Sequence, residues 1–306
     1  MRYLECPVTV IAPGTSANLG PGFDSFGLAL SIADTVQAEV TAAGLGVDVV
    51  GEGAGDVPRD ESHLVVRAMR AAFDAMGGQP PGLALRCRNL LPHGRGLGSS
   101  SAAIVGGIVA ARSLTEHGAD LLDETAALRL AHEMEGHPDN VAACLLGGLT
   151  LAWIDTEGAH AARLDVEADV VVFVPPHAVA TTHARGLLPE VVSHADAAHN
   201  AGRAGLLVAA LTGRRTDLLM IGTEDRLHQA YRLDDMPASL ELLESLRSRR
   251  VPAVISGAGP SVLAFVSGSP SASTVLAAED EVVGLAPPGW KALALGVAPG
   301  GAHRLG

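Results

Sequence analysis

The chain has 306 residues, of which 48% are hydrophobic, and a formal net charge of -13 at pH 7. A chain of this length can bury one large core or two moderate ones, and so acidic a chain argues against a nucleic-acid partner. No apolar run reaches the ~18 residues of a membrane-spanning helix, so no membrane partner is expected. Three cysteines without metal-ligand spacing, and an N-terminus without the apolar core of a signal peptide, predict a cytoplasmic protein.

In chain order, short apolar strands alternate with amphipathic helices, which indicates an α+β protein. In the first half we expect strands at Val8–Ile11, Thr35–Thr41, Val47–Gly51, Gly82–Asn89 and Leu149–Ile154, and helices at Ser62–Met76, Ser99–His117 and Leu122–Glu135. In the second half we expect strands at Asp169–Val174, Ala253–Ile255 and Val262–Val266, and helices at Asp196–Thr212 and Pro237–Arg249. The polar stretch Glu157–Leu164 contains a glycine and predicts a turn between a domain of residues 1–162 and one of residues 163–306.

One stretch, Pro92–Ala103, places three glycines directly before a predicted helix that opens with three hydroxyls. Glycines let backbone N–H groups approach an anion closely, and the free amides at a helix N-terminus carry partial positive charge. The stretch is not a Walker A motif, because the only lysine, Lys291, lies far away, and its glycine spacing is not that of a dinucleotide-binding loop. It predicts a site for a nucleotide polyphosphate; the alternative is a tight turn without a ligand.

Three further motifs accompany this loop: APGTSANLGPGFD at residues 12–24, EGHPDN at residues 135–140 and SGAGPSVL at residues 256–263. In this order the four segments resemble the signature motifs of the GHMP small-molecule kinases, and the resemblance is closest to the homoserine kinase family. It runs from about Val8 to Val266. It implies a two-domain GHMP kinase fold, with a ribosomal-protein-like α/β N-terminal domain and a ferredoxin-like C-terminal domain, and it suggests a homodimer.

The resemblance implies ATP and Mg²⁺ as cofactors. The residues that it assigns to ATP are Pro92, Gly94, Arg95, Gly96, Leu97, Gly98, Ser99, Ser100, Ser101, Gly257 and Gly259. For Mg²⁺ it favours Ser99 or Ser100 together with Glu135, with Glu133 as the fallback. Three alternatives stay open: one serine could be a helix N-cap, Arg95 could be a solvated side chain, and Gly257 and Gly259 could serve only a tight hairpin.

An L-homoserine substrate carries an ammonium, a carboxylate and the reacting hydroxyl. By resemblance, Arg185 and Arg232 bind the carboxylate, for which a planar guanidinium is well shaped. Both arginines belong to the second half of the chain, so the substrate is predicted to bridge the two domains. The remaining assignments by resemblance are Asp24 and the nearby His137 for the ammonium, and Asn18 and Asn140 for orienting the hydroxyl. As alternatives, Asp24 could cap a helix and Asn18 could be an ordinary turn residue.

The general base is open at this stage. Asp139 occupies the position where other GHMP kinases place a catalytic aspartate, but this family can pass the hydroxyl proton directly to the γ-phosphate. Positioning and charge stabilisation supply most of the catalysis of phosphoryl transfer, so a base is not obligatory. Asp139 is therefore a second-tier catalytic candidate. Ala143 and Ala230 stand where the family usually has proline, which leaves the preferred hydroxy amino acid open.

These motifs predict ATP-dependent phosphorylation of the side-chain hydroxyl of L-homoserine to O-phospho-L-homoserine, a step of threonine biosynthesis. One alternative is a GHMP kinase that acts on another hydroxy amino acid or amino alcohol. Another, from a different class, is a non-catalytic small-molecule sensor on the same fold. The presence of Ser99–Ser101, Glu135 and both arginines argues against a sensor, which would not need the magnesium-binding set.

Overall fold

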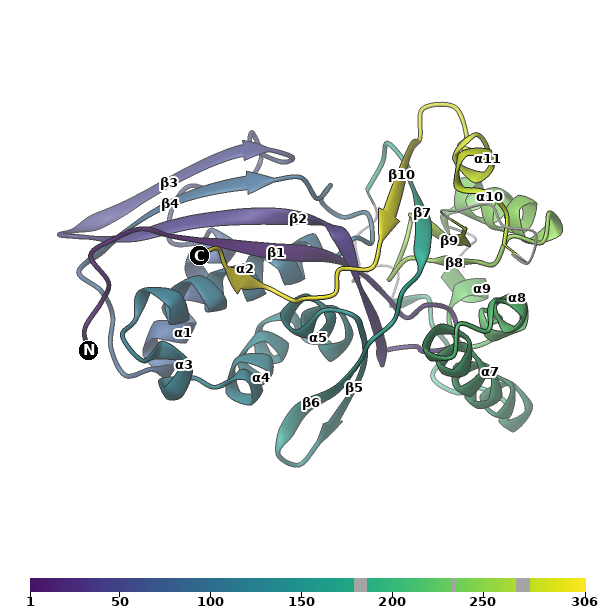
Figure 1. The fold of residues 1–306 in the computed structure, drawn as a ribbon, viewed down its shortest axis with the longest axis horizontal. Helices are drawn as coiled ribbons and strands as arrows, with labels where there is room; N and C mark the ends of the chain where they lie inside the picture. The colour runs from purple at the N-terminus through teal and green to yellow at the C-terminus, as the bar shows by residue number, and fades with distance from the viewer. Residues whose placement is uncertain (179–185, 233–234, 268–275) are drawn as a thin grey trace.

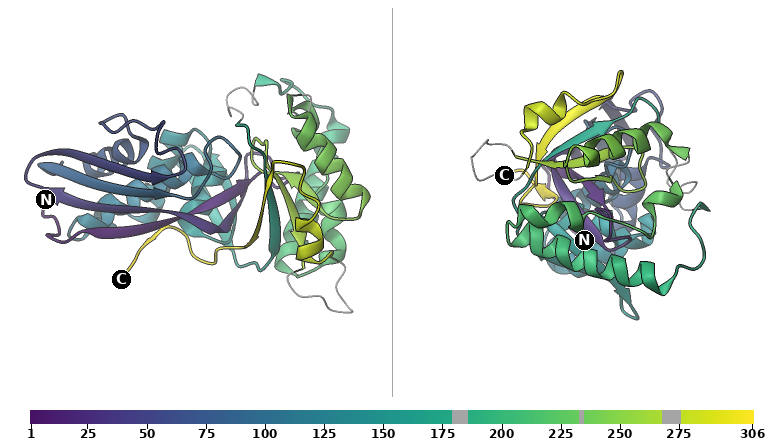
Figure 2. Two further views of the ribbon diagram at one scale, coloured as in Figure 1. Left: turned by 90° about the horizontal axis from the view of Figure 1, so that it is seen from above. Right: turned by 90° about the vertical axis from the view of Figure 1, so that its right-hand side faces the viewer.

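The computed structural model describes residues 1–178, 186–232, 235–267 and 276–306. Two β-sheets, one of seven strands and one of four, form the two halves of an elongated molecule (Figure 1). The first half carries its helices on one side of a long twisted sheet, and the second half stands across its end, as the view from above shows (Figure 2). Arg185 lies outside the described residues, so its predicted position is not examined further.

The first sheet has the strand order β11-β1-β2-β4-β3, and the hairpin of β5 and β6 is attached to β2. Its strands are β1 (Val8–Ala17), β2 (Phe26–Thr41), β3 (Gly44–Gly51), β4 (Gly82–Asn89), β5 (Leu149–Asp155), β6 (Gly158–Leu164) and β11 (His303–Arg304). All pairs are antiparallel except β3 with β4. A parallel pair needs a crossover connection, and helix α1 (Leu64–Ala75) supplies it.

Five helices cover one face of this sheet: α1, α2 (Ser99–Leu114), α3 (Gly118–Leu121), α4 (Glu124–Glu135) and α5 (Pro138–Leu146) (Figure 1). Helix α2 lies in the middle and is apolar on nearly every side, because it packs against both the sheet and α1. At Gly107 a Cβ atom would lie 2.7 Å from the carbonyl oxygen of Val65, so only glycine lets the two helices approach this closely. This packing fixes the N-terminus of α2 at the edge of the core.

The second sheet has the order β10-β7-β9-β8 and is antiparallel throughout. Its strands are β7 (Asp169–Val174), β8 (Ala253–Ile255), β9 (Val262–Val266) and β10 (Lys291–Gly296). In chain order the first strand lies between the fourth and the third, with the second at the edge, which is the ferredoxin-like arrangement that the sequence predicts. The helical segments are α7 (His194–Thr212), η1 (Thr216–Leu218), α8 (Leu219–Gly222), α9 (Gln229–Arg232), α10 (Pro237–Ser248) and α11 (Glu279–Val283).

Strand β7 links the two halves, because both of its faces are buried. Val170 and Val172 belong to an apolar cluster that also includes Leu28 and Leu97 of the first half. Val171 and its neighbours on the opposite face pack in a second cluster with α10 and α11. Side chains alternate between the faces of a strand, so one continuous apolar run supplies both cores. The two halves therefore share a core where they meet.

Three sequence-based expectations about the elements are wrong. The strand expected to begin at Thr35 already begins at Phe26, as β2. Residues Glu157–Leu164 are not a boundary turn: Gly158–Leu164 is strand β6, which pairs with β5, and only the residues just before it turn. The helix expected at Ser99–His117 ends at Leu114, because Thr115 is extended and pairs with Tyr3. Strand β11, near the C-terminal end of the chain, pairs with β1 in the first sheet. The predicted domain boundary after residue 162 stays a prediction. Within the described residues, no helix combines the length and apolar character needed to cross a membrane.

Candidate active site

The glycine loop at residues 94–98, called the phosphate loop below after its predicted ligand, has the backbone of an anion-binding nest. Gly94, Gly96 and Gly98 have φ angles of 66°, 71° and 67°, a left-handed conformation that favours glycine. Gly98 is the N-cap of α2, and no side chain caps the helix, so its first amides are not used by a capping side chain. The alternative of a serine N-cap is wrong, because Ser99 is already the first helical residue. Alternating left-handed residues followed by a helix N-terminus are a backbone arrangement that suits phosphate, so the geometry favours the predicted ATP site, which stays a prediction.

Glu135 faces the same helix N-terminus. Its Oε1 accepts hydrogen bonds from Ser100 Oγ at 2.6 Å and from Ser101 Oγ at 3.1 Å. Glu133, two residues earlier on α4, is exposed, so the geometry favours Glu135 over it. One carboxylate beside serine hydroxyls suits Mg²⁺, which commonly uses one or two carboxylates and completes its shell with water and phosphate. The described residues contain no cluster of three or more His, Cys, Asp or Glu side chains that could hold a metal ion.

A cavity of about 320 Å³ adjoins the loop at Ser99 and Ser100. Its apolar lining includes Val57, Pro58 and Leu64, and its polar lining includes Asp34, His63 and Asn89. The His63 side chain is 5% exposed, and its Nδ1 has no hydrogen-bond partner. An apolar cavity with a few polar groups is typical of a small-molecule site. The sequence analysis missed these residues, because they come from separate segments and form no motif.

Asp34 is a buried carboxyl in this cavity, and burial raises its pKa to about 6. Its Oδ1 accepts hydrogen bonds from the backbone N–H groups of Leu90 at 2.7 Å and Leu91 at 2.9 Å, which partly offset the effect of burial. The nearby Glu52 raises the pKa further. The carboxylate form is therefore costly inside the fold.

We expect Asp34→Asn to stabilise the protein above pH 6, because an amide oxygen can accept the same two hydrogen bonds without a buried charge. As the pH falls, the folded wild type takes up this proton near pH 6, before the unfolded chain does, and so gains stability relative to its state at neutral pH. The variant should exceed the wild type by about 2 to 3 kcal/mol at pH 8 and lose this advantage near pH 4. Urea unfolding at pH 4, 6 and 8 measures the difference, and a pH-independent difference would contradict the assignment.

Asn18 and Asp24 lie in the loop between β1 and β2, both with left-handed φ angles. The Asn18 side chain is buried; its Nδ2 donates to the carbonyl oxygen of Gly257 at 2.8 Å, and its Oδ1 accepts from the backbone N–H of Asp24 at 2.9 Å. Asp24 is not a helix cap, because strand β2 begins at Phe26. Asn18 is more than a turn residue, since its amide ties this loop to the second half of the chain.

The turn between β8 and β9 contacts the phosphate loop directly. Ser256 Oγ lies 2.6 Å from the Gly96 carbonyl oxygen, to which it donates, and 2.8 Å from Ser16 Oγ. The backbone N–H of Gly257 donates to the carbonyl oxygen of Ala17 at 3.0 Å. Gly257 and Gly259 both have positive φ angles, so the turn is a glycine-dependent hairpin as well as a contact to the loop.

Helix α5 presents the third motif to the same place. His137 is its N-cap, and Asp139, which is 3% exposed, accepts from the backbone N–H of Asn140 at 2.7 Å. Asn140 Oδ1 accepts a hydrogen bond from Thr15 Oγ1 at 2.7 Å. The backbone N–H of Thr15 in turn donates to the carbonyl oxygen of Leu97 in the phosphate loop. Three motifs that lie apart in the sequence therefore meet around Thr15.

The two arginines that the sequence singles out in the described residues are both engaged. Arg232, on α9, is 3% exposed; its Nη1 lies 3.1 Å from His228 Nδ1 and 3.5 Å from the Gly257 carbonyl oxygen. Arg95 donates to three backbone carbonyls, those of His93, Pro175 and Pro176. The alternative of a solvated Arg95 is wrong, because its guanidinium links the phosphate loop to the segment after β7. Its predicted contact with ATP stays a prediction.

Comparison with known proteins agrees with this geometry. The family model for the GHMP kinases N terminal domain matches residues 63–148. A homoserine kinase of Streptomyces avermitilis is 56% identical over 99% of this chain and 97% of its own length. The chain belongs to the homoserine kinase family. A relative named homoserine kinase from Mycolicibacterium smegmatis is 49% identical over 85% of both chains.

Solved structures with a similar fold include a homoserine kinase and another GHMP kinase. The crystal structure of homoserine kinase from Cytophaga hutchinsonii has a TM-score of 0.82 and 25% identity, and the match covers 100% of this chain and 99% of that one. L. major mevalonate kinase, solved with R-mevalonate, has a TM-score of 0.68 at 17% identity over 95% of this chain and 96% of that one, which shows the shared fold alone. The two-domain GHMP kinase fold expected from the sequence is confirmed.

In this member of the homoserine kinase family, most predicted site residues lie around one region. The phosphate loop, the Asn18 loop, the N-terminus of α5 and the β8–β9 turn are joined by the hydrogen bonds of Thr15, Asn18 and Ser256. The sequence analysis missed the cavity beside Ser99. It also assigned no role to His228, although this residue lies four positions before Arg232, which it assigned to the carboxylate.

Proposed function

We propose that this homoserine kinase family member transfers the γ-phosphoryl group of ATP to the side-chain hydroxyl of L-homoserine, giving O-phospho-L-homoserine and ADP. The observation that carries this proposal is the meeting of the phosphate loop with the Asn18 loop through the turn at Ser256 and Gly257. This contact supports the proposal, because the loop assigned to the polyphosphate and the loop assigned to the small substrate both contact the same turn.

For ATP, the amides of the Gly94–Gly98 nest and of the first turn of α2 suit the phosphates. The cavity beside Ser99 has a volume of about 320 Å³, and its size and mainly apolar lining suit the nucleoside. Glu135, with Ser100, is the side-chain set that would hold Mg²⁺. When bound, Mg²⁺ supplies charge stabilisation for the phosphoryl oxygens.

For homoserine, we assign Arg232 to the carboxylate and Asp24, with His137, to the ammonium. A guanidinium and a carboxylate form strong charge-assisted hydrogen bonds, and Asp24 supplies the opposite charge for the ammonium. Asn18 and Asn140 orient the reacting hydroxyl, and their own side chains are held by Gly257 and Thr15. Arg185 is a second predicted ligand of the carboxylate.

In the reaction, the homoserine hydroxyl oxygen forms a bond to the γ-phosphorus as the bond from that phosphorus to the bridging oxygen of ADP breaks. The hydroxyl proton goes to a γ-phosphate oxygen, and no protein base is required. Asp139 is the alternative acceptor. Its Oδ1 accepts a hydrogen bond from the backbone N–H of Asn140 at 2.7 Å, which supports a role in holding the N-terminus of α5.

We expect Asp139→Asn to lower kcat by less than about 10²-fold, below the range of a positioned general base. An amide oxygen can still accept from the Asn140 N–H, so the local backbone should be kept. Steady-state kinetics at saturating substrates, with thermal unfolding as the check on folding, measure this. A loss beyond about 10³-fold in a well-folded variant would make Asp139 the base.

The proposed function is tested by ATP turnover with a panel of acceptors: L-homoserine, L-threonine, L-serine and 3-aminopropan-1-ol. We expect L-homoserine to have the highest kcat/KM, with ADP and O-phospho-L-homoserine formed in equal amounts. Preference for another hydroxy amino acid would reassign the substrate, and binding without turnover would indicate a sensor. The homodimer and the cytoplasmic location stay predictions.

A further inference from the structure

His228, which the reaction above does not use, lies fully buried between two parts of the substrate site. Its Nε2 is 2.8 Å from the carbonyl oxygen of Gly20, in the loop that also carries Asn18 and Asp24. Its Nδ1 is 3.1 Å from Nη1 of Arg232. One imidazole therefore connects the arginine assigned to the carboxylate with the loop assigned to the hydroxyl and the ammonium.

The two partners determine the state of the imidazole. A carbonyl oxygen can only accept a hydrogen bond and a guanidinium can only donate one. His228 therefore carries its proton on Nε2 and accepts from Arg232 at Nδ1, since a protonated ring would set two N–H groups against each other. Burial lowers the pKa of His228, and this prevails although the Asp225 carboxylate, 3.8 Å from Nε2, and Asp24 raise it.

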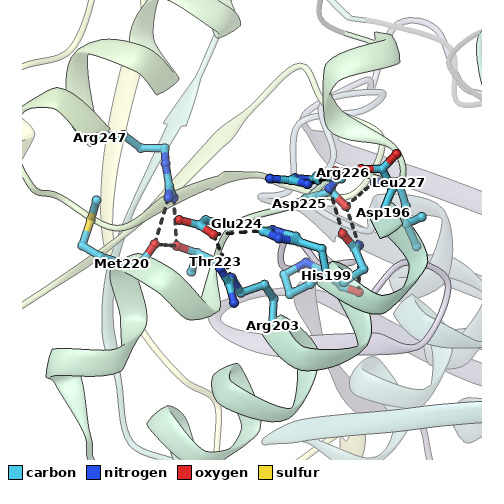
Figure 3. A network of polar contacts seen from close by, with 12 residues as sticks. Asp196, His199, Arg203, Met220, Thr223, Glu224, Asp225, Arg226, Leu227 and Arg247 are labelled. Carbon is cyan, nitrogen blue, oxygen red and sulfur yellow. Dashed lines mark hydrogen bonds and ion pairs between the residues drawn. The ribbon is translucent and has the colours of Figure 1, made fainter. Parts of the chain in front are cut away.

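The backbone of His228 is held by Asp225. The Asp225 side chain is fully buried and accepts from the N–H groups of Leu227, His228 and Gln229 at 3.0, 3.1 and 2.8 Å. Asn200 Nδ2 donates to the same carboxylate at 2.8 Å. Figure 3 shows Asp225 next to Arg226 and Leu227, beside the contacts of Glu224 with His199 and Arg203. Asp225 thus fixes the backbone at the start of α9. The imidazole of His228 therefore has little freedom to follow a displaced Arg232.

The ring is also held from the side. Phe23 stacks on His228 with the ring centres 5.1 Å apart, and the guanidinium carbon of Arg232 lies 5.5 Å from the centre of the same Phe23 ring. The Gly257 carbonyl oxygen lies near both Arg232 Nη1, at 3.5 Å, and Asn18 Nδ2, at 2.8 Å. A change in the direction of Arg232 would therefore reach Asn18 through this shared oxygen.

We propose that His228 is a positioning residue, which aims the Arg232 guanidinium and so sets how tightly the site holds the carboxylate of a hydroxy amino acid. The proposal rests on the proposed function and names a specificity-determining residue for it. His228 contacts Arg232 and Gly20, and it acts on the substrate through Arg232. Loss of its hydrogen bonds should weaken recognition of the carboxylate and leave the nucleotide site unchanged.

The test compares His228→Phe, which keeps a ring that can stack on Phe23 but removes both hydrogen bonds, with His228→Gln, which keeps one donor and one acceptor. We expect the phenylalanine variant to raise the homoserine KM about tenfold, the loss typical of a hydrogen bond to a charged group, with the ATP KM within about twofold. The glutamine variant should recover part of this loss. With 3-aminopropan-1-ol, which has no carboxylate, kcat/KM should fall clearly less than with homoserine in both variants, because only the effect through the Gly20 loop and Asn18 remains.

His199→Phe is the matched control, because His199 contacts Glu224 in the network of Figure 3 at 3.5 Å and is 13% exposed. It should leave the homoserine KM unchanged. If His228→Phe does not fold, the homoserine KM is measured for His228→Gln, for Arg232→Ala and for the double variant. The double variant should then have the same homoserine KM as Arg232→Ala alone. A wild type that does not phosphorylate homoserine refutes the proposed function. An active wild type with an unchanged homoserine KM in the folded variants, or with equal losses for both acceptors, refutes the role of His228.

Discussion

Replacing Glu135 by glutamine should lower kcat by about 10²- to 10³-fold and raise the Mg²⁺ concentration needed for half-maximal activity. The carboxylate accepts from Ser100 and Ser101 at the N-terminus of α2, next to the phosphate nest. An amide keeps the shape of the side chain but removes the negative charge that attracts a divalent cation. Initial rates over a Mg²⁺ titration, at saturating ATP and homoserine, measure both effects.

Glu133→Gln is the control for this variant. Glu133 lies on the same helix and is exposed, so its substitution removes the same net charge without touching the serines. It should leave kcat and the Mg²⁺ requirement within about twofold of the wild type, as surface substitutions have small effects. Equal, mild losses in the two variants would mean that the phosphates alone hold the metal, and the assignment of Glu135 would fail.

Gly96→Ala should reduce kcat/KM for ATP by about 10²-fold or more and also destabilise the fold. A Cβ atom at Gly96 would lie 2.2 Å from the carbonyl oxygen of Ser256 and 3.0 Å from that of Gly259. Both are backbone atoms, so no side-chain rotation relieves the clash. Either the phosphate loop or the β8–β9 turn has to move, and the hydrogen bond from Ser256 to the Gly96 carbonyl would be disturbed.

An alanine in a left-handed conformation lowers the stability even without a clash, and Gly44→Ala measures this loss. Gly44 has a φ angle of +80°, against +71° at Gly96, and a Cβ atom there would meet nothing within 4 Å. This control should lose about 1 to 2 kcal/mol of stability and keep its activity. Thermal unfolding and ATP kinetics of both variants separate the strain of a left-handed alanine from the displacement of the phosphate loop by the clash. Similar kinetics in the two would show that the contact with the turn is not needed for ATP binding.

The sequence by itself predicted an α+β protein with two halves and four motifs of the site, and the resemblance of those motifs to the GHMP kinases implied the family and the two-domain fold. It could do so because each motif is local: three glycines, a helix start and a run of hydroxyls carry their chemistry within a few residues. Strand and helix periodicity likewise depends on neighbours, so most elements were placed correctly to within a few residues. Strand β6 was missed, because the partner that makes Gly158–Leu164 a strand is the adjacent β5, and a polar sequence with a glycine does not reveal that pairing.

Only the tertiary structure decided which side chains of those motifs act on one another. It turned Ser100 and Ser101 toward Glu135, made Gly98 the helix cap and used Arg95 to tie the loop to Pro175 and Pro176. It also placed Asn18 against Gly257, 239 residues further along the chain, and His228 between Gly20 and Arg232. Such contacts depend on how two sheets pack across a shared core. The order of residues in the chain does not reveal that packing. Local preferences determine the conformation of each segment, but they do not determine which distant segment it contacts.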